Sequence, residues 1–321
     1  MQKSGDPTLG LIGTSPAIEE LRRLIAKLAG SNKPVLVSGP TGAGKELVVG
    51  AIHALGARPD APMLAINCGA IPESLLEAQL FGHEKGAFTG ADQRREGLLA
   101  SAGEGTLFLD ELAELPLALQ AKLLRVLESG TFRAVGGTAE QEFHGRFVSA
   151  THANLAERVS TGAFREDLWY RLNVLELRVP PLDDRRQDIP LLVEHFCAAQ
   201  SRRLHFSSGA LNLLMERSWP GNVRQLRNLV DRIAVLAADD FVDERVVMDF
   251  LGQSLPCASR APELEELARA VLRLDVPNKL EAMARVLVHE AMVQARWNKS
   301  AAARLLGVDR KMVQRLLDPT G

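Results

Sequence analysis

Two segments of the chain carry residues suited to chemistry on a phosphate group. The first is a loop that combines glycines at fixed spacing with a lysine, and it runs Gly39, Pro40, Thr41, Gly42, Ala43, Gly44 and Lys45. Glycines of this kind let backbone N–H groups converge on phosphate oxygens, and the lysine neutralises the phosphate charge. The alternative is a glycine-rich turn with no ligand. Most P-loops also have Ser or Thr at the position that Glu46 occupies here.

The second segment is an apolar run that ends in two carboxylates, Asp110 and Glu111. Ligands of open α/β sheets bind at the carboxyl ends of the strands. We therefore expect Asp110 to hold Mg²⁺ through water and Glu111 to polarise the attacking water. The alternative is an acidic pair that caps the next helix. Together the two segments predict nucleotide hydrolysis, but kinases, helicases, transporters and protein remodellers all share this pair of motifs.

Short apolar runs separated by helical stretches must position these two segments. The runs lie at Val35–Val37, Met63–Ile66, Thr106–Leu109, Phe147–Ala150 and Val174–Leu177. Runs of this length are typical of buried parallel strands, and their alternation with helices indicates βαβ units. The predicted fold is α/β, with a parallel-sheet core that presents the glycine-rich loop between a strand and the helix starting near Glu46.

The composition of the chain changes after Val179-Pro180-Pro181, beyond which only helical periods appear up to about residue 252. The predicted organisation is therefore an N-terminal lead (1–10), an α/β subdomain (11–182), an α-helical subdomain (183–252), a linker (253–276) and an all-α domain (277–321). Residues 276–321 contain eight Lys or Arg and four Asp or Glu, whereas the whole chain has a net charge of −2. Any contact with nucleic acid must therefore come from a local patch.

The overall composition is that of an ordinary globular protein, with 46% apolar and 24% charged residues. The three cysteines are scattered and form no CxxC pair, which fits a reducing compartment better than a disulfide framework. The N-terminus has no apolar signal segment, and no window of the chain is long and apolar enough to cross a membrane. We expect a cytoplasmic protein.

A glycine-rich loop between the two nucleotide motifs carries one large apolar residue. It consists of Gly86, Ala87, Phe88, Thr89, Gly90 and Ala91. Glycines and small residues disfavour a stable helix, so the loop suits a mobile tip that presents an aromatic ring and a hydroxyl to a partner. The alternative is a surface hairpin whose phenylalanine is incidentally buried.

Here the chain resembles the bacterial enhancer-binding proteins, the sigma-54-dependent activators of the AAA+ superfamily, because residues 86–91 spell their GAFTGA signature in full. The resemblance extends from about Leu11 to the C-terminus. It implies an ATPase that acts on sigma-54 and RNA polymerase, with Phe88 and Thr89 in contact with sigma-54 and with the 183–252 subdomain as a lid. In that family the residue after the P-loop lysine is commonly Glu, as Glu46 is here.

The resemblance also suggests residues that sense the bound nucleotide. Asn67 would be the switch asparagine that holds Glu111 until the partner engages; the alternative is a polar strand end bonded to the backbone. Thr151 and His152 fall at the first sensor position, which often carries Asn where this chain has His152. Arg224 would be the second sensor, reading the γ-phosphate from the lid, and the alternative is a plain capped helix with Asn222 as the cap.

Two further arginines, Arg165 and Arg171, match the family segment that acts across subunit interfaces. An arginine supplied in trans contributes about 10³–10⁵ in rate because it balances charge in the transition state. The resemblance therefore implies a ring, usually a hexamer. From the residues alone, the alternative is surface ion pairs with Glu166 and Asp167, which contribute little stability.

The end of the chain reads as helix, turn, helix, with Gly307 ending the first helix and Asp309 capping the second. Val313, Leu316, Leu317 and Met312 should face inward. The expected contacts to double-stranded DNA are Lys299, Ser300, Arg310, Lys311, Gln314 and Arg315. This segment resembles the Fis-type DNA-binding domain, which dimerises through the preceding helix. The alternative is a solvated amphipathic helical hairpin.

The glycine-rich loop begins at Gly39, which leaves no room for the N-terminal regulatory domain that typical family members carry. We expect control by a separate partner protein or by expression level, unless the sequence is truncated. Two rival functions remain at this stage. One is a general AAA+ remodeller that is indifferent to sigma-54, and the other is a non-enzymatic DNA-binding regulator with a degenerate P-loop. Intact Lys45, Asp110 and Glu111 argue against the second rival.

Overall fold

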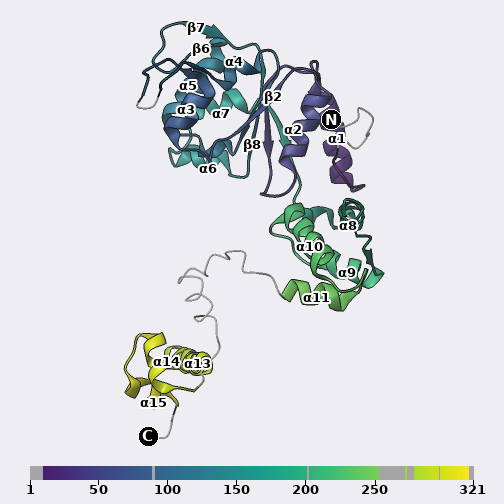
Figure 1. The fold of residues 1–321 in the computed structure, drawn as a ribbon, viewed down its shortest axis with the longest axis vertical. Helices are drawn as coiled ribbons and strands as arrows, with labels where there is room; N and C mark the ends of the chain where they lie inside the picture. Colours follow the sequence, from purple (N-terminus) through teal and green to yellow (C-terminus); the bar gives the residue numbers. More distant parts are fainter. Residues whose placement is uncertain are drawn as a thin grey trace. The chain divides into compact units, whose positions relative to one another are not determined.

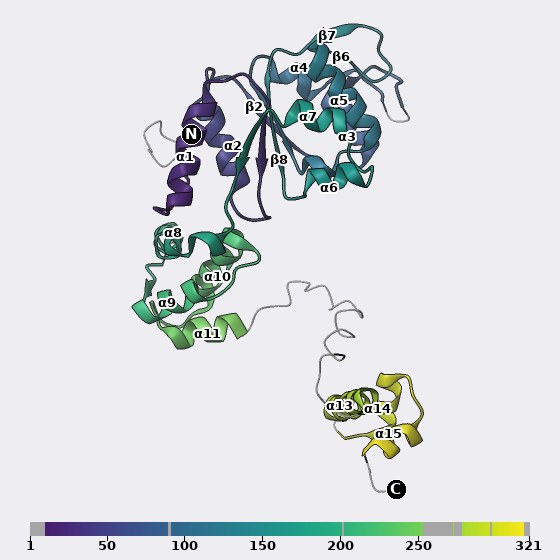
Figure 2. The ribbon, with the colours of Figure 1, turned by 180° about the vertical axis from the view of Figure 1, so that it is seen from behind.

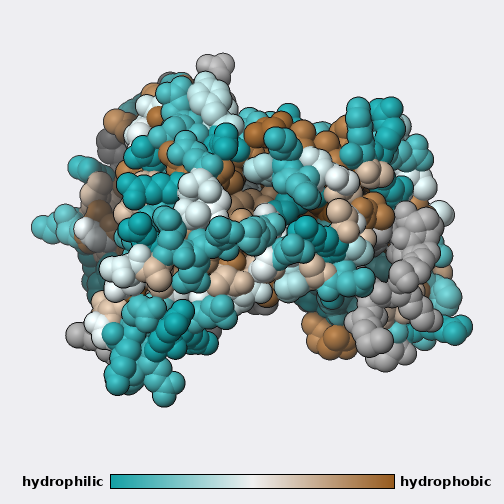
Figure 3. All heavy atoms as spheres, turned by 90° about the horizontal axis from the view of Figure 1, so that it is seen from above, coloured by the Kyte–Doolittle hydropathy of each residue, from teal (hydrophilic) through white to brown (hydrophobic). Residues whose placement is uncertain are grey.

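The computed structural model describes residues 10–88, 91–200, 202–252, 272, 278–295 and 297–317. The chain divides into two compact units, Met1–Gln253 and Ser254–Gly321, and each is described by itself. Most of the expected linker, residues 253–276, lies outside the described residues, as do Thr89 and Gly90 of the glycine-rich loop. Across the face drawn in Figure 3, hydrophilic residues predominate and hydrophobic side chains are scattered between them. Among the described residues, no helix has the length and apolar character needed to span a bilayer.

A five-stranded sheet with all its pairs parallel forms the centre of the first unit (Figure 1). Its order is β2 (Met63–Asn67), β5 (Thr106–Asp110), β8 (Arg146–Thr151), β1 (Val35–Ser38) and β9 (Leu175–Arg178). These are the five apolar runs that the sequence predicts, each within one residue at either end. The predicted α/β class with a parallel sheet is confirmed.

Helices cover both faces of this sheet (Figures 1 and 2). One face carries α1 (Pro16–Ala29) and α2 (Lys45–Ala54), and the other carries α3 (Glu73–Phe81), α4 (Leu98–Ala102), α5 (Leu117–Ser129), α6 (Leu155–Ser160) and α7 (Glu166–Leu172). Alternate side chains of β1 point to opposite faces of the sheet. Val35 and Val37 pack in the core under α1 and α2, and Leu36 packs in the core on the other face. The result is a three-layer α/β subdomain.

Short strands that the apolar pattern does not predict extend from this core. β3 (Gly82–His83) pairs with β4 (Arg95–Glu96), and β6 (Thr131–Arg133) pairs with β7 (Glu140–Glu142), both antiparallel. A bridge between His83 and Val135 links the two ribbons. The loop carrying residues 86–91 lies between β3 and β4, so this ribbon presents it.

A helical subdomain follows the sheet within the same unit. It contains a 3-10 segment, η2 (Leu182–Asp188), then α8 (Ile189–Ala198), α9 (Ser208–Glu216), α10 (Asn222–Leu236) and α11 (Glu244–Gly252), around the buried indole of Trp219. Leu226, Val230 and Ile233 lie on the buried face of α10. Two-residue strands, β10 (His205–Phe206) and β11 (Phe241–Val242), also pair here, so the expectation of helices alone is wrong at these positions. Strands this short leave no periodic signal.

The second unit contains three helices, α13 (Lys279–Gln294), α14 (Lys299–Leu306) and α15 (Arg310–Leu317), around a small core. Gly307 ends α14 in the left-handed conformation, and the Asp309 carboxylate accepts the backbone N–H of Met312 at 2.8 Å, so both predicted turn residues are confirmed. Met312 was expected to face inward, but 38% of it is exposed, whereas Val313 fills the core. Leu316 and Leu317 pack against this core as expected, so the side of α15 that carries Met312 is the one left exposed.

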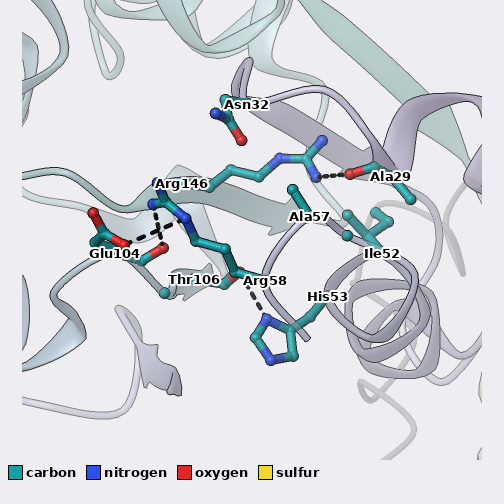
Figure 4. Close-up of a pocket in the computed structure, with 11 residues that line it drawn as sticks. Ala29, Asn32, Ile52, His53, Ala57, Arg58, Glu104, Thr106 and Arg146 are labelled. Atoms are coloured by element: carbon teal, nitrogen blue, oxygen red, sulfur yellow. Dashed lines mark hydrogen bonds and ion pairs between the residues drawn. The ribbon is translucent and has the colours of Figure 1, made fainter. Parts of the chain in front are cut away.

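Arg146 secures the amino-terminal edge of the sheet (Figure 4). Its guanidinium donates to the carbonyls of Leu28 at 2.9 Å, Ala29 at 3.0 Å and Lys33 at 3.1 Å. Two of these carbonyls belong to the last turn of α1, where the helix leaves carbonyls short of donors, although that of Leu28 also accepts the N–H of Ser31 at 3.1 Å. The arginine is buried, and burial lowers the pKa of its guanidinium. It therefore fastens α1 to β8 at the edge opposite the glycine-rich loop.

We predict that Arg146→Met lowers the free energy of unfolding by about 2–4 kcal/mol, because three carbonyls in buried or half-buried bonds lose a charged donor. Urea unfolding followed by circular dichroism measures this. Arg23→Met is the matched control, since Arg23 lies on α1 in an exposed ion pair with Glu20 and should change stability by less than about 0.5 kcal/mol. Equal effects of the two substitutions would contradict the assignment.

Candidate nucleotide-hydrolysis site

The glycine-rich loop turns between β1 and α2 with its glycines in conformations that other residues avoid. Gly39, Gly42 and Gly44 have φ values of 153°, 76° and 108°. A Cβ at Gly42 would stand 2.4 Å from the carbonyl oxygen of Gly221, so glycine is required there on steric grounds as well. The loop delivers the free N–H groups of the first turn of α2 to the carboxyl edge of the sheet, where anions bind.

Lys45 is the first residue of α2 and is buried against the loop. Its ammonium donates to the carbonyls of Gly39 at 3.0 Å and Pro40 at 3.4 Å. Burial lowers the pKa of this ammonium, while the carboxylates of Glu111 and Asp110 act in the opposite direction. The lysine therefore lies in the same electrostatic environment as the two predicted catalytic carboxylates.

Asp110 ends β5 and lies beside Asn67, which ends the neighbouring strand β2 at the paired position. The Asn67 side-chain amide donates to the Asp110 carboxylate at 3.1 Å, and its oxygen accepts the backbone N–H of Gly69 at 2.9 Å. The family resemblance placed Asn67 on Glu111, but in this structure its amide holds the neighbouring carboxylate. Burial raises the pKa of the Asp110 carboxyl, and the backbone N–H of Glu111 lowers it.

Glu111 is instead held by His152, the residue at the first sensor position. The His152 Nδ1 and the Glu111 carboxylate are 2.5 Å apart. Glu111 has φ 51°, a left-handed conformation that is rare for residues with a side chain and often marks functional positions. Thr151 ends β8, accepts the N–H of Gly39 through its carbonyl at 3.2 Å, and pairs in register with Ser38.

Asp110 is the candidate ligand for a divalent cation, at the end of β5. Among the described residues there is no group of three or more histidine, cysteine or acidic side chains that could form an all-protein metal site. This donor set fits magnesium, which commonly binds one or two carboxylates and completes its shell with water and substrate phosphates. Glu46 is exposed in the first turn of α2.

The two predicted trans-acting arginines lie on or next to α7 and are engaged locally. The Arg165 guanidinium pairs with the Asp167 carboxylate through bonds of 3.1 and 2.7 Å, and this ion pair is exposed. Arg171 donates to the carbonyl of Leu127 at 3.2 and 3.1 Å. The pairing of Arg165 with Asp167 is the surface ion pair that the sequence analysis gave as the alternative. A role of Arg165 and Arg171 across a subunit interface stays a prediction.

The helical subdomain contacts the loop through its backbone and through two residues whose role the sequence did not indicate. The N–H of Arg224 donates to the carbonyl of Gly42 at 3.2 Å. Asn222 does not cap α10 as expected, since Gly221 is the cap residue and the Asn222 amide donates to Thr41 at 3.1 Å. Arg185 donates to Ala43 at 2.8 Å. No pattern in the surrounding Leu182–Asp188 segment distinguishes this arginine from Arg186.

The loop carrying the GAFTGA sequence is closed at its base by backbone bonds. The N–H of Gly86 donates to Ala91 at 2.8 Å, and the N–H of Ala91 donates to Phe88 at 3.0 Å. Phe88 is 45% exposed, and its ring centroid lies 4.9 Å from that of His83. The aromatic side chain is therefore presented at the surface rather than buried in the core.

The expected DNA-contacting residues lie on α14 and α15 of the second unit. Arg310, Lys311 and Arg315 are exposed on α15. Lys299 donates to the side-chain oxygen of Gln314 at 2.6 Å, which joins the two helices, and Ser300 lies exposed in the first turn of α14. At about 100° per residue, Lys311 and Arg315 lie on the side of α15 that faces away from Val313, and Arg310 lies exposed at the start of the helix.

A parallel α/β sheet with a P-loop, a strand ending in two carboxylates and a following helical subdomain defines an AAA+ ATPase. Comparison with known families supports this class. Residues 11–178 match the sigma-54 interaction domain, residues 183–263 the AAA+ ATPase lid domain, and residues 279–316 the Fis family of bacterial regulatory proteins. The chain belongs to the sigma-54-dependent transcriptional activators.

Individual relatives agree with this family. The chain is 44% identical to the response regulator protein PilR of Pseudomonas aeruginosa over 95% of its own length and 68% of PilR. It is 42% identical to the transcriptional regulator NtrC of Escherichia coli over 98% of its length and 71% of NtrC. A crystal structure of NtrX from Brucella abortus with ADP has a TM-score of 0.71 and 34% identity, covering 96% of this chain and 68% of NtrX.

We predict that Glu111→Gln lowers ATP turnover at least about 100-fold while nucleotide affinity stays within a few-fold, because only the base for the attacking water is lost. Steady-state ATPase assays and binding of a fluorescent ATP analogue measure the two effects. Glu114→Gln is the control, since Glu114 pairs with Arg158 on the surface. Loss of both affinity and turnover in the first variant, or equal turnover in both variants, would exclude Glu111 as the base.

Proposed function

We propose that this protein is a cytoplasmic ATP-dependent transcription activator that binds upstream DNA and converts the closed complex of sigma-54 RNA polymerase to the open complex. The observation that supports this most directly is the loop of residues 86–91, with Phe88 exposed, on a ribbon of the same subdomain as the P-loop. Residues 11–182 and 183–252 would form the ATPase and its lid, residues 253–276 the linker, and residues 277–321 the DNA-binding domain.

Hydrolysis would use the residues that meet at the carboxyl edge of the sheet. The N–H groups of the loop and the Lys45 ammonium would bind the phosphates of ATP, as NtrX is shown with ATP and ADP. Magnesium would supply charge neutralisation for the phosphates, and Asp110 would hold it. Glu111 would orient the attacking water after separating from His152, and Asn67 and Thr151 flank these carboxylates. Arg224 would sense the γ-phosphate from the lid.

The proposed active form is a ring, most simply a hexamer, in which Arg165 and Arg171 enter the site of the neighbouring subunit. The bonds these arginines make in the single chain are exposed and easily exchanged, because surface ion pairs contribute about 0–1 kcal/mol. Balancing the γ-phosphoryl charge in a neighbour would contribute far more to the rate.

DNA binding is proposed to use α14 and α15 as a helix-turn-helix, with α15 in the major groove. Arginine suits guanine edges and glutamine suits adenine edges, which assigns Arg310, Arg315 and Gln314 to bases and Lys299, Ser300 and Lys311 to the backbone. Leu280, Val286 and Leu287 of α13 are exposed, which supports dimerisation through this helix as in other Fis-type domains.

The proposal is tested by open-complex formation with purified sigma-54 RNA polymerase on supercoiled DNA. We expect open complexes with ATP and none with a non-hydrolysable analogue. Thr89→Ala should retain ATPase activity within about threefold of the unchanged protein and lose open-complex formation. Thr161→Ala, at an exposed helix end, is the control. Open complexes formed by Thr89→Ala at the unchanged rate would reject the contact of this loop with sigma-54.

We predict complementation between two inactive variants if the arginine acts across an interface. Arg165→Ala and Lys45→Ala should each lower ATP turnover strongly, since one removes the trans-acting charge and the other the phosphate contact. Mixed rings contain interfaces with an intact Lys45 on one side and an intact Arg165 on the other, so mixing should restore part of the turnover. Absence of recovery at every mixing ratio would show that Arg165 does not act in trans.

A further inference from the structure

Three consecutive carbonyl groups of the P-loop are held by donors from the helical subdomain. The Asn222 side-chain amide donates to Thr41 at 3.1 Å, the Arg224 N–H donates to Gly42 at 3.2 Å, and the Arg185 guanidinium donates to Ala43 at 2.8 Å. The two side-chain donors, Arg185 and Asn222, lie 142 and 181 residues further along the chain than the carbonyls they bind. The subdomain therefore contacts the loop on the side opposite to its nucleotide-facing N–H groups.

These bonds determine where the N–H groups of the loop point. In a trans peptide unit the C=O of one residue and the N–H of the next point in opposite directions within one plane. Fixing the carbonyls of Thr41 and Ala43 thus fixes the N–H groups of Gly42 and Gly44, while the bond to Gly42 holds the peptide whose N–H, that of Ala43, donates to the carbonyl of Pro40 at 3.3 Å. Groups that are oriented before a ligand arrives bind it more tightly, because the ordering cost is already met.

Asn222 is built for this contact at a conformational cost. It is 2% exposed and has φ 53°, in the left-handed region. Its side-chain oxygen accepts the N–H of Leu182 at 2.8 Å while its amide reaches Thr41, so one side chain joins the start of η2 to the loop. An asparagine that only capped α10 would need neither a left-handed backbone conformation nor a buried side chain.

Placing Arg185 in this contact also costs free energy, and its guanidinium is also directed at the loop. It is 4% exposed, burial lowers the pKa of its guanidinium, and its Nε has no hydrogen-bond partner. Burying a charged group is unfavourable unless it is compensated, and the described compensation is the bond to Ala43 together with the charge of Asp188. The side chain thus places a buried positive charge directly behind the phosphate-binding turn.

Asp188, at the other end of η2, holds the segment that precedes α1. Its carboxylate accepts the N–H groups of Thr14 at 2.7 Å and Ser15 at 2.8 Å, and the Ser15 hydroxyl at 2.6 Å. A Cβ at Gly13 would stand 2.6 Å from this carboxylate. The η2 segment therefore contacts the P-loop through Arg185, at its kink, and the N-terminal segment through Asp188, at its end.

We propose that Arg185 and Asn222 are positioning residues of the ATPase, which orient the P-loop peptide units from behind and so couple the placement of the lid to phosphate binding. The inference rests on nucleotide binding at the P-loop and not on any contact with sigma-54. It predicts that the lid controls affinity for ADP as well as ATP, because the oriented N–H groups serve every phosphate that the loop holds. Sensing by the Arg224 side chain, in contrast, concerns the γ-phosphate alone.

The first test measures the affinity for fluorescent ADP in Arg185→Gln and Asn222→Gly. Glycine is chosen at 222 because it accepts a φ of 53° without strain. Each variant should weaken ADP binding about tenfold, the cost of one directed hydrogen bond. Arg186→Gln is the matched control, because the Arg186 guanidinium also donates to carbonyls, at Met215 and Glu216, but within the lid. It should leave ADP affinity within about twofold. Equal weakening in all three variants would overturn the proposal.

A second readout separates positioning from general loss of stability. Arg185→Lys retains the charge and a donor, and it should recover at least half of the affinity lost in Arg185→Gln. In the Arg185→Gln/Asn222→Gly double variant at saturating ADP, hydrogen exchange should stay slowed in α2, while the slowing in α10 should be lost. If ADP slowed hydrogen exchange in α10 of the double variant as much as in the unchanged protein, the proposal would also be overturned.

Two outcomes for the unchanged protein separate this proposal from the proposed function. If the unchanged protein failed to bind ADP, the assignment of the nucleotide site would be wrong. If it bound ADP but formed no open complexes, only the proposed function with sigma-54 would be rejected.

Discussion

The hydrogen bonding of the loop between β1 and α2 is the constraint on which the site depends. A polypeptide turn rich in glycine has little conformation of its own, so its shape must come from partners outside it. The neighbouring strand supplies the carbonyl of Thr151 to the N–H of Gly39, and the helical subdomain supplies donors to the carbonyls of residues 41–43. The Lys45 ammonium donates to the carbonyls of Gly39 and Pro40. The loop is thus shaped by the sheet on one side and the lid on the other.

The surroundings of the two candidate catalytic carboxylates follow from the register of the same sheet. Asn67 lies opposite Asp110 because β2 and β5 pair in parallel register, and this pairing brings the asparagine amide to Asp110. Glu111, one residue beyond the strand, turns into a left-handed conformation and meets His152, one residue beyond β8. The imidazole thereby engages the Glu111 carboxylate. In the proposed mechanism Glu111 separates from His152 before it orients the attacking water.

The sequence predicted the central fold well because the five main strands are continuous apolar runs with both faces buried, a signal carried by adjacent residues. It also predicted the turn residues Gly307 and Asp309, whose effects are local. It did not predict β10 and β11, which are too short for a periodic pattern, or the exposure of Met312. It assigned Asn222 to a helix cap, because capping is the ordinary use of asparagine beside a Pro-Gly turn; the actual partner, Thr41, lies 181 residues away.

The sequence by itself determined the family, the glycine and lysine positions of the P-loop, the paired carboxylates and the GAFTGA loop, since each consists of neighbouring residues whose spacing fixes their chemistry. Only the tertiary structure decided which of two adjacent arginines, Arg185 or Arg186, reaches the loop, and which carboxylate Asn67 holds. Such choices depend on the kink within η2 and on strand register, which place side chains within about 3 Å of partners far along the chain. The spacing of neighbouring residues in the sequence does not predict such long-range contacts.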